Sequence, residues 1–323
     1  MNVLMAANLE KTITDEIDAL AAGYGIHNTY GRNFTDTEMG NFDVLFVGWG
    51  WNRGEALYDL IARGKNIRLL QTLSAGVDYL RFASIPEGIT VCSNAGAYSE
   101  PIAEHTFALI LSLAKNIKMN EAMMRNGVFD SKSHTMKLDG AVLGIFGYGG
   151  IGREVAKIGR ALGMRIFAVS RKKPDEEDVD FFRTPEDLDE MLRMSDVVVI
   201  TSPLNRLTEG LFDRRRLQTM KKESMLINVA RGPIVAEKDL YEHMKANPRF
   251  RAGVDTWWNE PVQGSKFEPH YDFLSLPNFA GSPHNSGIVG GMGRHSLMKA
   301  YENVIRYAQG KKLQNIVNRA DYL

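Results

Sequence analysis

Short runs of apolar residues alternate along the chain with segments in which apolar residues recur every three or four positions. In the first part of the chain, the runs that predict β-strands lie at residues 3–6, 44–47, 69–73 and 90–92. Helical spacing separates several of them, at residues 14–22 and 54–63, and a longer helix is predicted from residue 100 to about residue 116. Strands that alternate with helices are typical of an α/β protein with a mainly parallel sheet.

A second series of the same kind follows a stretch without periodicity at residues 126–138. Its predicted strands lie at residues 141–146, 164–169, 197–201, 225–229, 251–255 and 279–282. A glycine-rich turn at 287–293 then leads into a helix at about 296–308, which could return to the first domain. The pattern predicts two doubly wound α/β domains, the second inserted into the first.

Composition agrees with this picture and narrows the possible partners. The 323 residues exceed the roughly 100–150 residues of a typical domain. The chain has 39 Lys and Arg against 39 Asp and Glu, and this balance disfavours nucleic acid or an acidic membrane as a partner. No apolar run reaches the roughly 20 residues that a membrane span needs, and the first residues lack the basic region of a signal peptide. We therefore expect a cytoplasmic protein.

The single cysteine, Cys92, excludes an intrachain disulfide and fits a reducing compartment. No other cysteine or histidine lies near it at the spacing of metal ligands, and we expect no metal site.

A glycine-rich turn follows the strand predicted at 141–146. Its residues are Gly147-Tyr148-Gly149-Gly150-Ile151-Gly152, and helical spacing begins directly after them. In such a turn the first glycine permits a tight bend, the second lets the backbone approach a pyrophosphate, and the third lets the helix pack on the strand. The N-terminus of the helix offers N–H groups to the phosphates. The turn therefore predicts a dinucleotide cofactor.

The end of the next strand bears on which dinucleotide binds. NAD enzymes usually carry an acid there, which accepts hydrogen bonds from the ribose. This strand instead runs into Ser170, Arg171, Lys172 and Lys173, and the first acid is Asp175. Serine and arginine could bind a 2′-phosphate that a carboxylate would repel. We favour NADP over NAD, with a solvated basic loop as the alternative interpretation.

Three other predicted strands of the second series end in residues with catalytic potential. The strand at 225–229 runs into Arg231, the strand at 251–255 into Glu260, and the strand at 279–282 into His284. Ligands of open α/β sheets bind beyond the carboxyl ends of the strands, so these side chains could converge if the strands are neighbours. Each residue also has a purely structural interpretation: Arg231 as a surface or ion-pairing residue, Glu260 with the following proline as a turn, and His284 as a loop cap.

Together the three residues fit hydride transfer to a 2-keto acid. Arginine grips a carboxylate and can polarise the carbonyl beside it. Histidine, with a reference pKa of about 6.5, can give the carbonyl oxygen its proton near neutral pH. A carboxylate beside the ring orients it and stabilises its charged form. We therefore predict that Glu260 supports His284 and that Arg231 binds the substrate.

These residues are where the chain resembles the D-isomer-specific 2-hydroxyacid dehydrogenase family, along nearly its whole length. The matching stretches are 74–78 (SAGVD), 103–106 (AEHT), 147–152, 227–232 (INVARG), 255–261 and 282–284 (SPH). Their order and spacing both agree with the family, and the match is more specific than any single motif. The D stereochemistry is implied by this resemblance alone.

The resemblance implies a substrate domain at 1–96 and 288–323 and an NAD(P)-binding domain at 97–287. It assigns catalysis to Arg231, Glu260 and His284. It implies that a loop in the first domain binds the substrate carboxylate through backbone N–H groups, with residues Ser74, Ala75, Gly76 and Val77. The cofactor residues implied, besides the glycine-rich turn with Ser170 and Arg171, are Ser202, Val229, Ala230, Asp255 (to the nicotinamide carboxamide) and Gly287. It also implies a homodimer through the cofactor domain, with 126–138 as an arm.

Departures from the family pattern leave several functions open. Trp257-Trp258 replaces a more usual aliphatic–Phe pair, and Asn285-Ser286 replaces an apolar pair, so the shape of the pocket is uncertain. Short glycerate, glyoxylate and hydroxypyruvate reductases stay open. Formate dehydrogenases carry Gln where Glu260 stands and are disfavoured, and a long phosphoglycerate dehydrogenase would need a further regulatory domain. From another class, an NAD(H)-sensing protein of the same fold is the alternative.

Three further features have less certain roles. His105, within an apolar helix, reads as a core histidine rather than a catalyst. Trp49 and Trp51 could line the substrate side of the cleft or pack under a loop. The run 214–216 of three arginines is expected to be a solvated face near the start of a helix.

Overall fold

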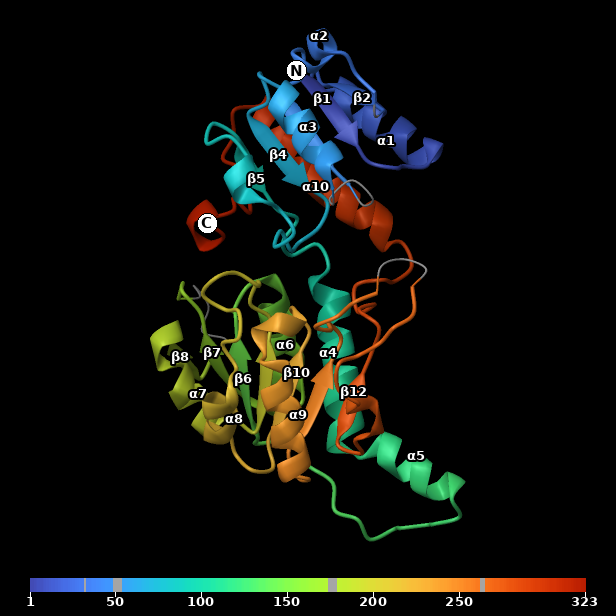
Figure 1. Cartoon of the computed structure of the whole chain (residues 1–323), viewed down its shortest axis with the longest axis vertical. Helices are drawn as coiled ribbons and strands as arrows, with labels where there is room; N and C mark the ends of the chain where they lie inside the picture. The colour runs from blue at the N-terminus through green and yellow to red at the C-terminus, as the bar shows by residue number, and fades with distance from the viewer. Residues whose placement is uncertain (32, 49–53, 174–178, 262–264) are drawn as a thin grey trace. The chain divides into compact units, whose positions relative to one another are not determined.

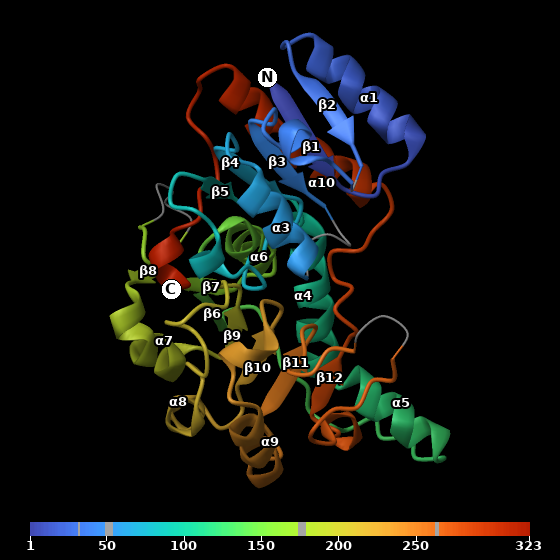
Figure 2. The same ribbon diagram turned by 45° about the horizontal axis from the view of Figure 1, so that its top comes forward.

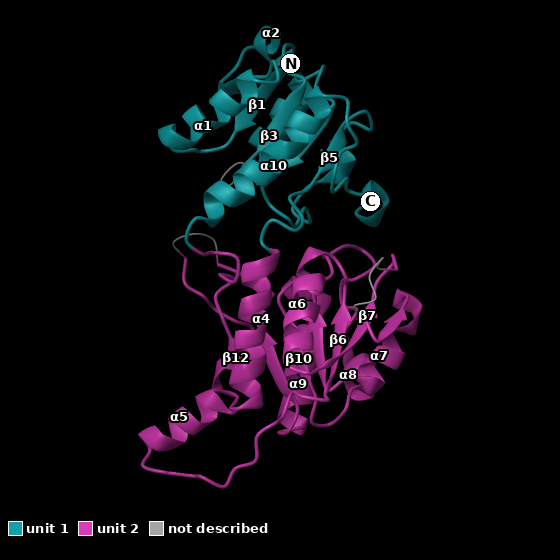
Figure 3. Cartoon of the chain, turned by 180° about the vertical axis from the view of Figure 1, so that it is seen from behind, with its two compact units in different colours: residues 1–98, 290–323 teal, residues 99–289 magenta. Residues whose placement is uncertain are grey.

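The structure is a computed structural model that describes residues 1–31, 33–48, 54–173, 179–261 and 265–323 (Figure 1). Trp49, Trp51 and Asp175 lie outside the described residues. Two units make up the chain: residues 1–98 with 290–323 form unit 1, and residues 99–289 form unit 2 (Figure 3). The unit boundaries therefore fall two residues after the positions expected from the sequence.

Unit 1 is built on a five-stranded parallel sheet with the order β2-β1-β3-β4-β5. Its strands are β1 (Asn2–Ala6), β2 (His27–Tyr30), β3 (Val44–Val47), β4 (Leu69–Thr72) and β5 (Thr90–Cys92). Its helices are α1 (Lys11–Ala22), α2 (Asp36–Met39), α3 (Glu55–Arg63) and α10 (Met292–Ala308). Successive side chains of β1 enter different cores: Val3 and Met5 pack with α1 and α10, and Leu4 with α2 and α3. Helices thus cover both faces of the sheet, as in a doubly wound fold.

Unit 2 is built on a seven-stranded parallel sheet with the order β12-β11-β10-β9-β6-β7-β8 (Figure 2). Its strands are β6 (Val142–Phe146), β7 (Arg165–Val169), β8 (Phe181–Arg183), β9 (Val197–Ile200), β10 (Met225–Asn228), β11 (Arg251–Val254) and β12 (Phe279–Gly281). Its helices are α4 (Ser99–Ala114), α5 (Ile117–Arg125), α6 (Gly150–Ala161), α7 (Leu188–Met194), α8 (Arg214–Thr219) and α9 (Glu237–Ala246). Strand order reverses between β6 and β9, and sheets of this kind bind ligands beyond the carboxyl ends of the strands at such a reversal.

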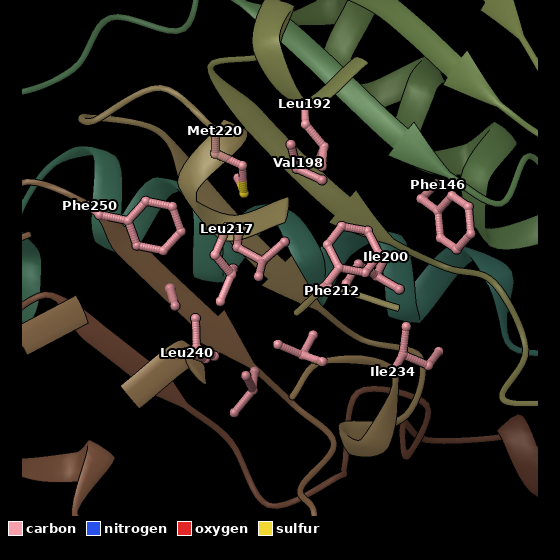
Figure 4. Packing of buried hydrophobic residues seen from close by; sticks show 14 of the residues in the cluster. Phe146, Leu192, Val198, Ile200, Phe212, Leu217, Met220, Ile234, Leu240 and Phe250 are labelled. Carbon is pink, nitrogen blue, oxygen red and sulfur yellow. The ribbon is translucent and has the colours of Figure 1, made fainter. Parts of the chain in front are cut away.

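Strand β9, in the middle of the sheet of unit 2, is apolar throughout because both of its faces are buried. Val198 and Ile200 of β9 join the cluster under α7, α8 and α9, where the labelled side chains of Figure 4 gather. Val197 and Val199 join the opposite cluster, under α4 and α6. The two parallel sheets confirm the predicted α/β class. None of the helices among the described residues is long and apolar enough to cross a membrane.

The three arginines at 214–216 begin α8, as expected, and they pair with acids rather than only with solvent. Arg215 and Arg216 bind Asp189 of α7. Arg214 binds Asp239 and Glu242 of α9. These ion pairs join three neighbouring helices on one side of unit 2.

Candidate active site

The glycine-rich turn connects β6 to α6, and its backbone requires glycine at two positions. Gly147 has a φ of +99°, and a Cβ on it would lie 2.6 Å from the backbone nitrogen of Ser202. A Cβ on Gly152 would collide with the carbonyl oxygen of Gly147. These glycines bring the turn, the start of α6 and the end of β9 into close contact, and Ser202 thereby lies beside the turn.

Gly149 differs from Gly147 and Gly152 in its open surroundings. A Cβ on Gly149 would meet no atom within 4 Å among the described residues. Gly149 is the N-cap of α6, whose first-turn N–H groups at Gly150, Ile151 and Gly152 have no carbonyl partners within the helix. Open space beside free donors at a helix N-terminus fits a pyrophosphate that approaches the backbone.

The residues after β7 are those predicted from the sequence to bind the adenosine ribose, and this role stays a prediction. The backbone N–H of Ser170 donates to the carbonyl oxygen of Arg183 at 3.2 Å, and so the serine is fixed beside β8. Ser170 is half-buried, and Arg171, Lys172 and Lys173 are exposed. This segment offers one hydroxyl and three cationic side chains to a ligand.

Arg231 follows β10 through a turn that Asn228 holds together. The side-chain amide of Asn228 donates to the carbonyl oxygen of Arg231 at 2.8 Å, and its oxygen accepts from the N–H of Ala230 at 3.1 Å. Val229 and Ala230 are buried within this turn. A Cβ on the next residue, Gly232, would collide with the backbone of Trp257 and Trp258, so the turn lies directly against the loop that carries Glu260.

Glu260 is fixed through both of its carboxylate oxygens. Oε1 accepts the backbone N–H of Trp257 at 3.0 Å, and Oε2 lies 2.8 Å from Nδ1 of His284. Burial raises the pKa of the Glu260 carboxyl, but the hydrogen bond and charge of His284, the Trp257 N–H and the charge of Arg231 outweigh burial. The net effect is a pKa below the ordinary value, and Glu260 is a carboxylate at neutral pH.

His284 occupies an unusual backbone conformation after β12. Its φ of +52° lies in the left-handed region, which residues other than glycine seldom adopt. Its backbone N–H donates to the carbonyl oxygen of Asp255 at 2.8 Å. The N–H groups of Asn285 and Ser286 donate to the Asp255 carboxylate, both at 3.2 Å. Three hydrogen bonds to one residue thus hold this turn.

The Asp255 side chain is fully buried and lies at the centre of a polar network. Besides the two N–H groups, it accepts a 2.6 Å hydrogen bond from Oγ of Ser282. That oxygen lies 2.7 Å from Nε2 of His105. Burial raises the pKa of the Asp255 carboxyl, whereas the hydrogen bonds from Ser282 and Ser286 and the charge of His105 lower it, with a net lowering. The predicted contact of Asp255 with the carboxamide stays a prediction.

The two tryptophans that depart from the family pattern are anchored within unit 2. Trp257 is 7% exposed and packs edge-on against Phe267 and Phe279. Trp258 stacks on Phe273, and its Nε1 donates to the carbonyl oxygen of Val235 at 2.6 Å. Trp257 therefore supports the loop from the core side.

The loop predicted to bind the substrate carboxylate belongs to unit 1. The carbonyl oxygen of Ser74 accepts the Thr72 hydroxyl at 2.8 Å and the Asn94 N–H at 3.0 Å, which fixes the start of the loop. Within the described residues, no acceptor is present for the N–H groups of Ala75, Gly76 and Val77. Successive free N–H groups of this kind suit an anion.

Within unit 2, the structure brings Glu260 and His284 into contact and places Arg231 close enough to affect the Glu260 carboxyl. Gly287 comes directly after Ser286, at the end of the turn that carries His284. The predicted Ser74–Val77 site lies in the other unit, and its part in the site stays a prediction. Sequence reasoning missed the link of His105 to this turn, because Ser282 lies 177 residues further along the chain.

Comparison with known proteins shows what this arrangement is similar to. The family model described as "D-isomer specific 2-hydroxyacid dehydrogenase, NAD binding domain" matches residues 107–286, more than half of the chain. This range includes the glycine-rich turn and the three residues Arg231, Glu260 and His284.

Individual relatives extend the likeness beyond that domain. A glyoxylate reductase of Aeropyrum pernix is 31% identical over 270 residues, which cover 81% of this chain and 79% of the relative. A hydroxypyruvate reductase of Thermotoga maritima is 32% identical over 229 residues, covering 70% and 72%. Among solved structures, a protein of Pyrobaculum aerophilum described as a candidate formate dehydrogenase is 27% identical, with a TM-score of 0.84 and full coverage of both chains.

Proposed function

Because this chain belongs to the D-isomer-specific 2-hydroxyacid dehydrogenase family, whose members are nicotinamide-dependent oxidoreductases of 2-hydroxy acids, we propose that it reduces a small 2-keto acid to the D-2-hydroxy acid. A substrate of the glycerate or hydroxypyruvate type is favoured. The observation that carries the proposal is the 2.8 Å contact between Oε2 of Glu260 and Nδ1 of His284.

This contact supports Nε2 of His284 as the atom that gives the proton. Glu260 is a carboxylate, an acceptor only, and therefore Nδ1 of His284 carries a proton that it donates to Oε2. Nε2 has no hydrogen-bond partner among the described residues. When the imidazole is fully protonated, Nε2 can give its proton to the carbonyl oxygen of the substrate as that oxygen becomes a hydroxyl. Glu260 stabilises the charged ring before the transfer and keeps it oriented afterwards.

Arg231 supplies the positive charge that a keto acid requires. Its guanidinium can bind the substrate carboxylate and polarise the adjacent carbonyl, so that the carbon becomes a better hydride acceptor. We also propose that the free N–H groups of Ala75, Gly76 and Val77, in unit 1, bind a substrate carboxylate. The bound nicotinamide supplies the hydride, and the protein supplies the proton and the binding.

The glycine-rich turn and the residues after β7 would hold the cofactor. Gly147, Gly149 and Gly152 suit the pyrophosphate, and Ser170 and Arg171 would bind the ribose end. Three cations and a hydroxyl, where NAD-linked enzymes place an acid, favour NADP over NAD. A 2′-phosphate adds two negative charges there, which Arg171 and its neighbours would neutralise.

Two relatives support the choice of substrate, since they are described as a glyoxylate reductase and a hydroxypyruvate reductase. The relative described as a candidate formate dehydrogenase is named for a different substrate, formate. Formate carries no keto group to protonate, whereas the Glu260–His284 pair provides a proton donor. The pair therefore favours a keto acid.

A homodimer through unit 2 is the assembly we propose. Helix α5 has no buried residue and projects, with the segment 126–138, from the body of unit 2 (Figure 1). Ile117 and Met124 are 56% and 54% exposed, and Phe129 is 84% exposed. Lys115 fixes the far end of the segment by donating to the carbonyl oxygen of Met136 at 2.7 Å. An anchored arm with exposed apolar side chains suits a contact with a second copy.

The test is the initial rate of NADPH and NADH oxidation with hydroxypyruvate, glyoxylate, pyruvate and phenylpyruvate. We expect turnover that prefers NADPH and a small keto acid, and we expect His284→Asn to lower kcat by at least about a hundredfold. Cofactor binding without turnover on any keto acid would instead favour the sensing function. Turnover that His284→Asn leaves unchanged would remove the catalytic assignment.

A further inference from the structure

His105 connects the first helix of unit 2 to the turn that carries His284. Its Nε2 lies 2.7 Å from Oγ of Ser282 and 3.6 Å from Oδ1 of Asp255. The Ser282 hydroxyl lies 2.6 Å from the same Oδ1. The His105 side chain is 25% exposed and belongs to α4, which otherwise packs apolar residues on the sheet. Three polar side chains thus form a chain from α4 to a buried carboxylate.

The direction of the hydrogen bonds follows from the carboxylate at the end of this chain. An ionised carboxylate only accepts, and so Ser282 must give its single hydroxyl proton to Asp255. The Ser282 oxygen then accepts from His105, and Nε2 of His105 must carry a proton. Loss of this donor would leave the hydroxyl oxygen without its partner and free to rotate away from Asp255.

Asp255 connects His105 and Ser282 to the turn that carries His284. Its carboxylate accepts the N–H groups of Asn285 and Ser286, and its carbonyl oxygen accepts the N–H of His284. These bonds hold His284 at a φ of +52°, which a histidine seldom adopts without support from its surroundings. A shift of Asp255 would therefore change the direction of the His284 ring toward Glu260.

We propose that His105 is a positioning residue, which acts through Ser282 and Asp255 to hold the His284 turn in the conformation that the reaction needs. It would touch neither the substrate nor the cofactor. The effect on turnover rests on the proposed function, because the turn bears on the rate only if His284 is the proton donor. The effect on the turn itself does not rest on that function.

Two substitutions of His105 separate the hydrogen bond from the packing. His105→Leu fills the space but removes the donor, whereas His105→Gln can place an amide N–H near the position of Nε2. Leu113→Ala, on the same helix with its side chain in the core of unit 2, is the control for general loss of stability. Ser282→Ala breaks the same chain one step later and serves as the second variant if His105→Leu does not fold.

The first measurement is steady-state reduction of hydroxypyruvate. We expect His105→Leu to lower kcat about tenfold, with KM within about twofold, because one oriented hydrogen bond is lost. His105→Gln should recover kcat to within about threefold of the wild type. Leu113→Ala should lower the melting temperature without lowering kcat. The double variant of His105→Leu and Ser282→Ala should be no slower than either single variant, because both act through Asp255.

The second measurement is amide hydrogen exchange of the resting protein, which needs no turnover. Segment 282–288 should exchange about tenfold faster in His105→Leu, but not in His105→Gln or Leu113→Ala. Wild-type exchange and wild-type kcat in His105→Leu would overturn the inference, as would His105→Gln that is as impaired as His105→Leu. If His284→Asn retains turnover, the proposed function fails, and the exchange of this segment still decides the role of His105.

Discussion

Nε1 of Trp257 donates a hydrogen bond of 2.8 Å to the carbonyl oxygen of Ser282. This bond ties the loop after β11, which carries Glu260, to the end of β12, which leads to His284. The indole also lies over Gly281, where a Cβ would stand 2.7 Å from the Trp257 ring. The loops that carry Glu260 and His284 are thus joined twice, by the contact between these two side chains and by the hydrogen bond from Trp257 to Ser282. Two connections of this kind preorganise the pair.

Glu260→Gln should weaken catalysis. The amide keeps the shape but loses the charge that stabilises the protonated imidazole of His284. We expect kcat for keto-acid reduction to fall at least about tenfold, because Nδ1 of His284 then faces an amide instead of a carboxylate. Steady-state rates at neutral pH test this expectation. A kcat equal to that of the wild type would contradict a supporting role for Glu260.

The same residue links stability to pH. The pKa of Glu260 is lowered in the folded protein, so its charge contributes stability that is fully present above the unfolded pKa of about 4.3. This contribution is lost as the pH falls through the folded pKa. The wild type should therefore unfold at higher urea concentration than Glu260→Gln at pH 7, and the two midpoints should approach each other below about pH 4. A difference that stays constant with pH would argue against this linkage.

Gly149→Ala should impair cofactor binding without harming the fold. A Cβ at this position meets no atom of the described residues within 4 Å, but it occupies the space through which a pyrophosphate would approach the backbone. We expect an unchanged melting temperature and a Kd for NADPH raised about tenfold or more, measured by fluorescence titration. Gly88→Ala in unit 1, also uncrowded, is the matched control and should change neither quantity. Wild-type affinity in Gly149→Ala would place the cofactor elsewhere.

Ser170→Asp should reverse the preference between the two cofactors. A carboxylate at this position would repel a 2′-phosphate and could accept hydrogen bonds from the ribose of NAD. We expect kcat/KM with NADPH to fall at least about tenfold, while the value with NADH holds or rises. The two cofactors act as internal controls within one protein preparation. If both values change by the same factor, Ser170 does not face the ribose end.

Phe129→Asp should dissociate the proposed dimer. The side chain is 84% exposed on the arm, and a charge there would have to be buried in the contact between two copies. Light scattering after gel filtration should give the dimer mass for the wild type and the monomer mass for the variant. Leu323→Asp changes an exposed apolar residue of unit 1 and should leave the dimer intact. A wild type that is already monomeric would remove the proposal.

Thr256→Val should stabilise the protein. The Thr256 hydroxyl is buried and has no hydrogen-bond partner among the described residues, so its loss removes an unsatisfied polar group. We expect the free energy of unfolding to rise by about 1 kcal/mol, measured in urea. Thr106→Val is the matched control, because the equally buried Thr106 hydroxyl donates to the carbonyl oxygen of Ile102 at 2.7 Å. Its substitution should bring no gain, and a loss in Thr256→Val would reveal a hidden partner.

The sequence predicted the strands of both sheets where burial leaves continuous apolar runs, as in β3 and β9. It did not predict β2, whose residues His27-Asn28-Thr29-Tyr30 are polar. This strand lies at the edge of the sheet and pairs with only one other strand, β1. Helix α5 was also missed, since none of its residues is buried and its apolar spacing marks no core face. Strands β3 and β9 could thus be predicted because burial requires apolar residues, whereas β2 and α5 carry no such pattern.

The same distinction applies to the candidate site. Glu260 and His284 could be paired in advance because parallel strands end at one edge of the sheet. The chain from His105 through Ser282 to Asp255 has no such rule, since it joins a helix to a distant strand end. Trp257 was expected to affect the shape of the pocket, but the structure buries its ring in the core, where the sequence could not place it.

Unit 1 consists of two segments that are separated by the whole of unit 2. Leu297 and Tyr301 of α10 cover the face of the first sheet that carries Val3 and Met5, and Asn94 donates to the carbonyl oxygen of Ser296 at 2.7 Å. During synthesis, the ribosome therefore releases all of unit 2 before it releases the helix that covers this sheet face. The intervening unit can fold first, while strands made earlier wait with an exposed apolar surface. Chaperone contact on the nascent chain should be strongest over this interval.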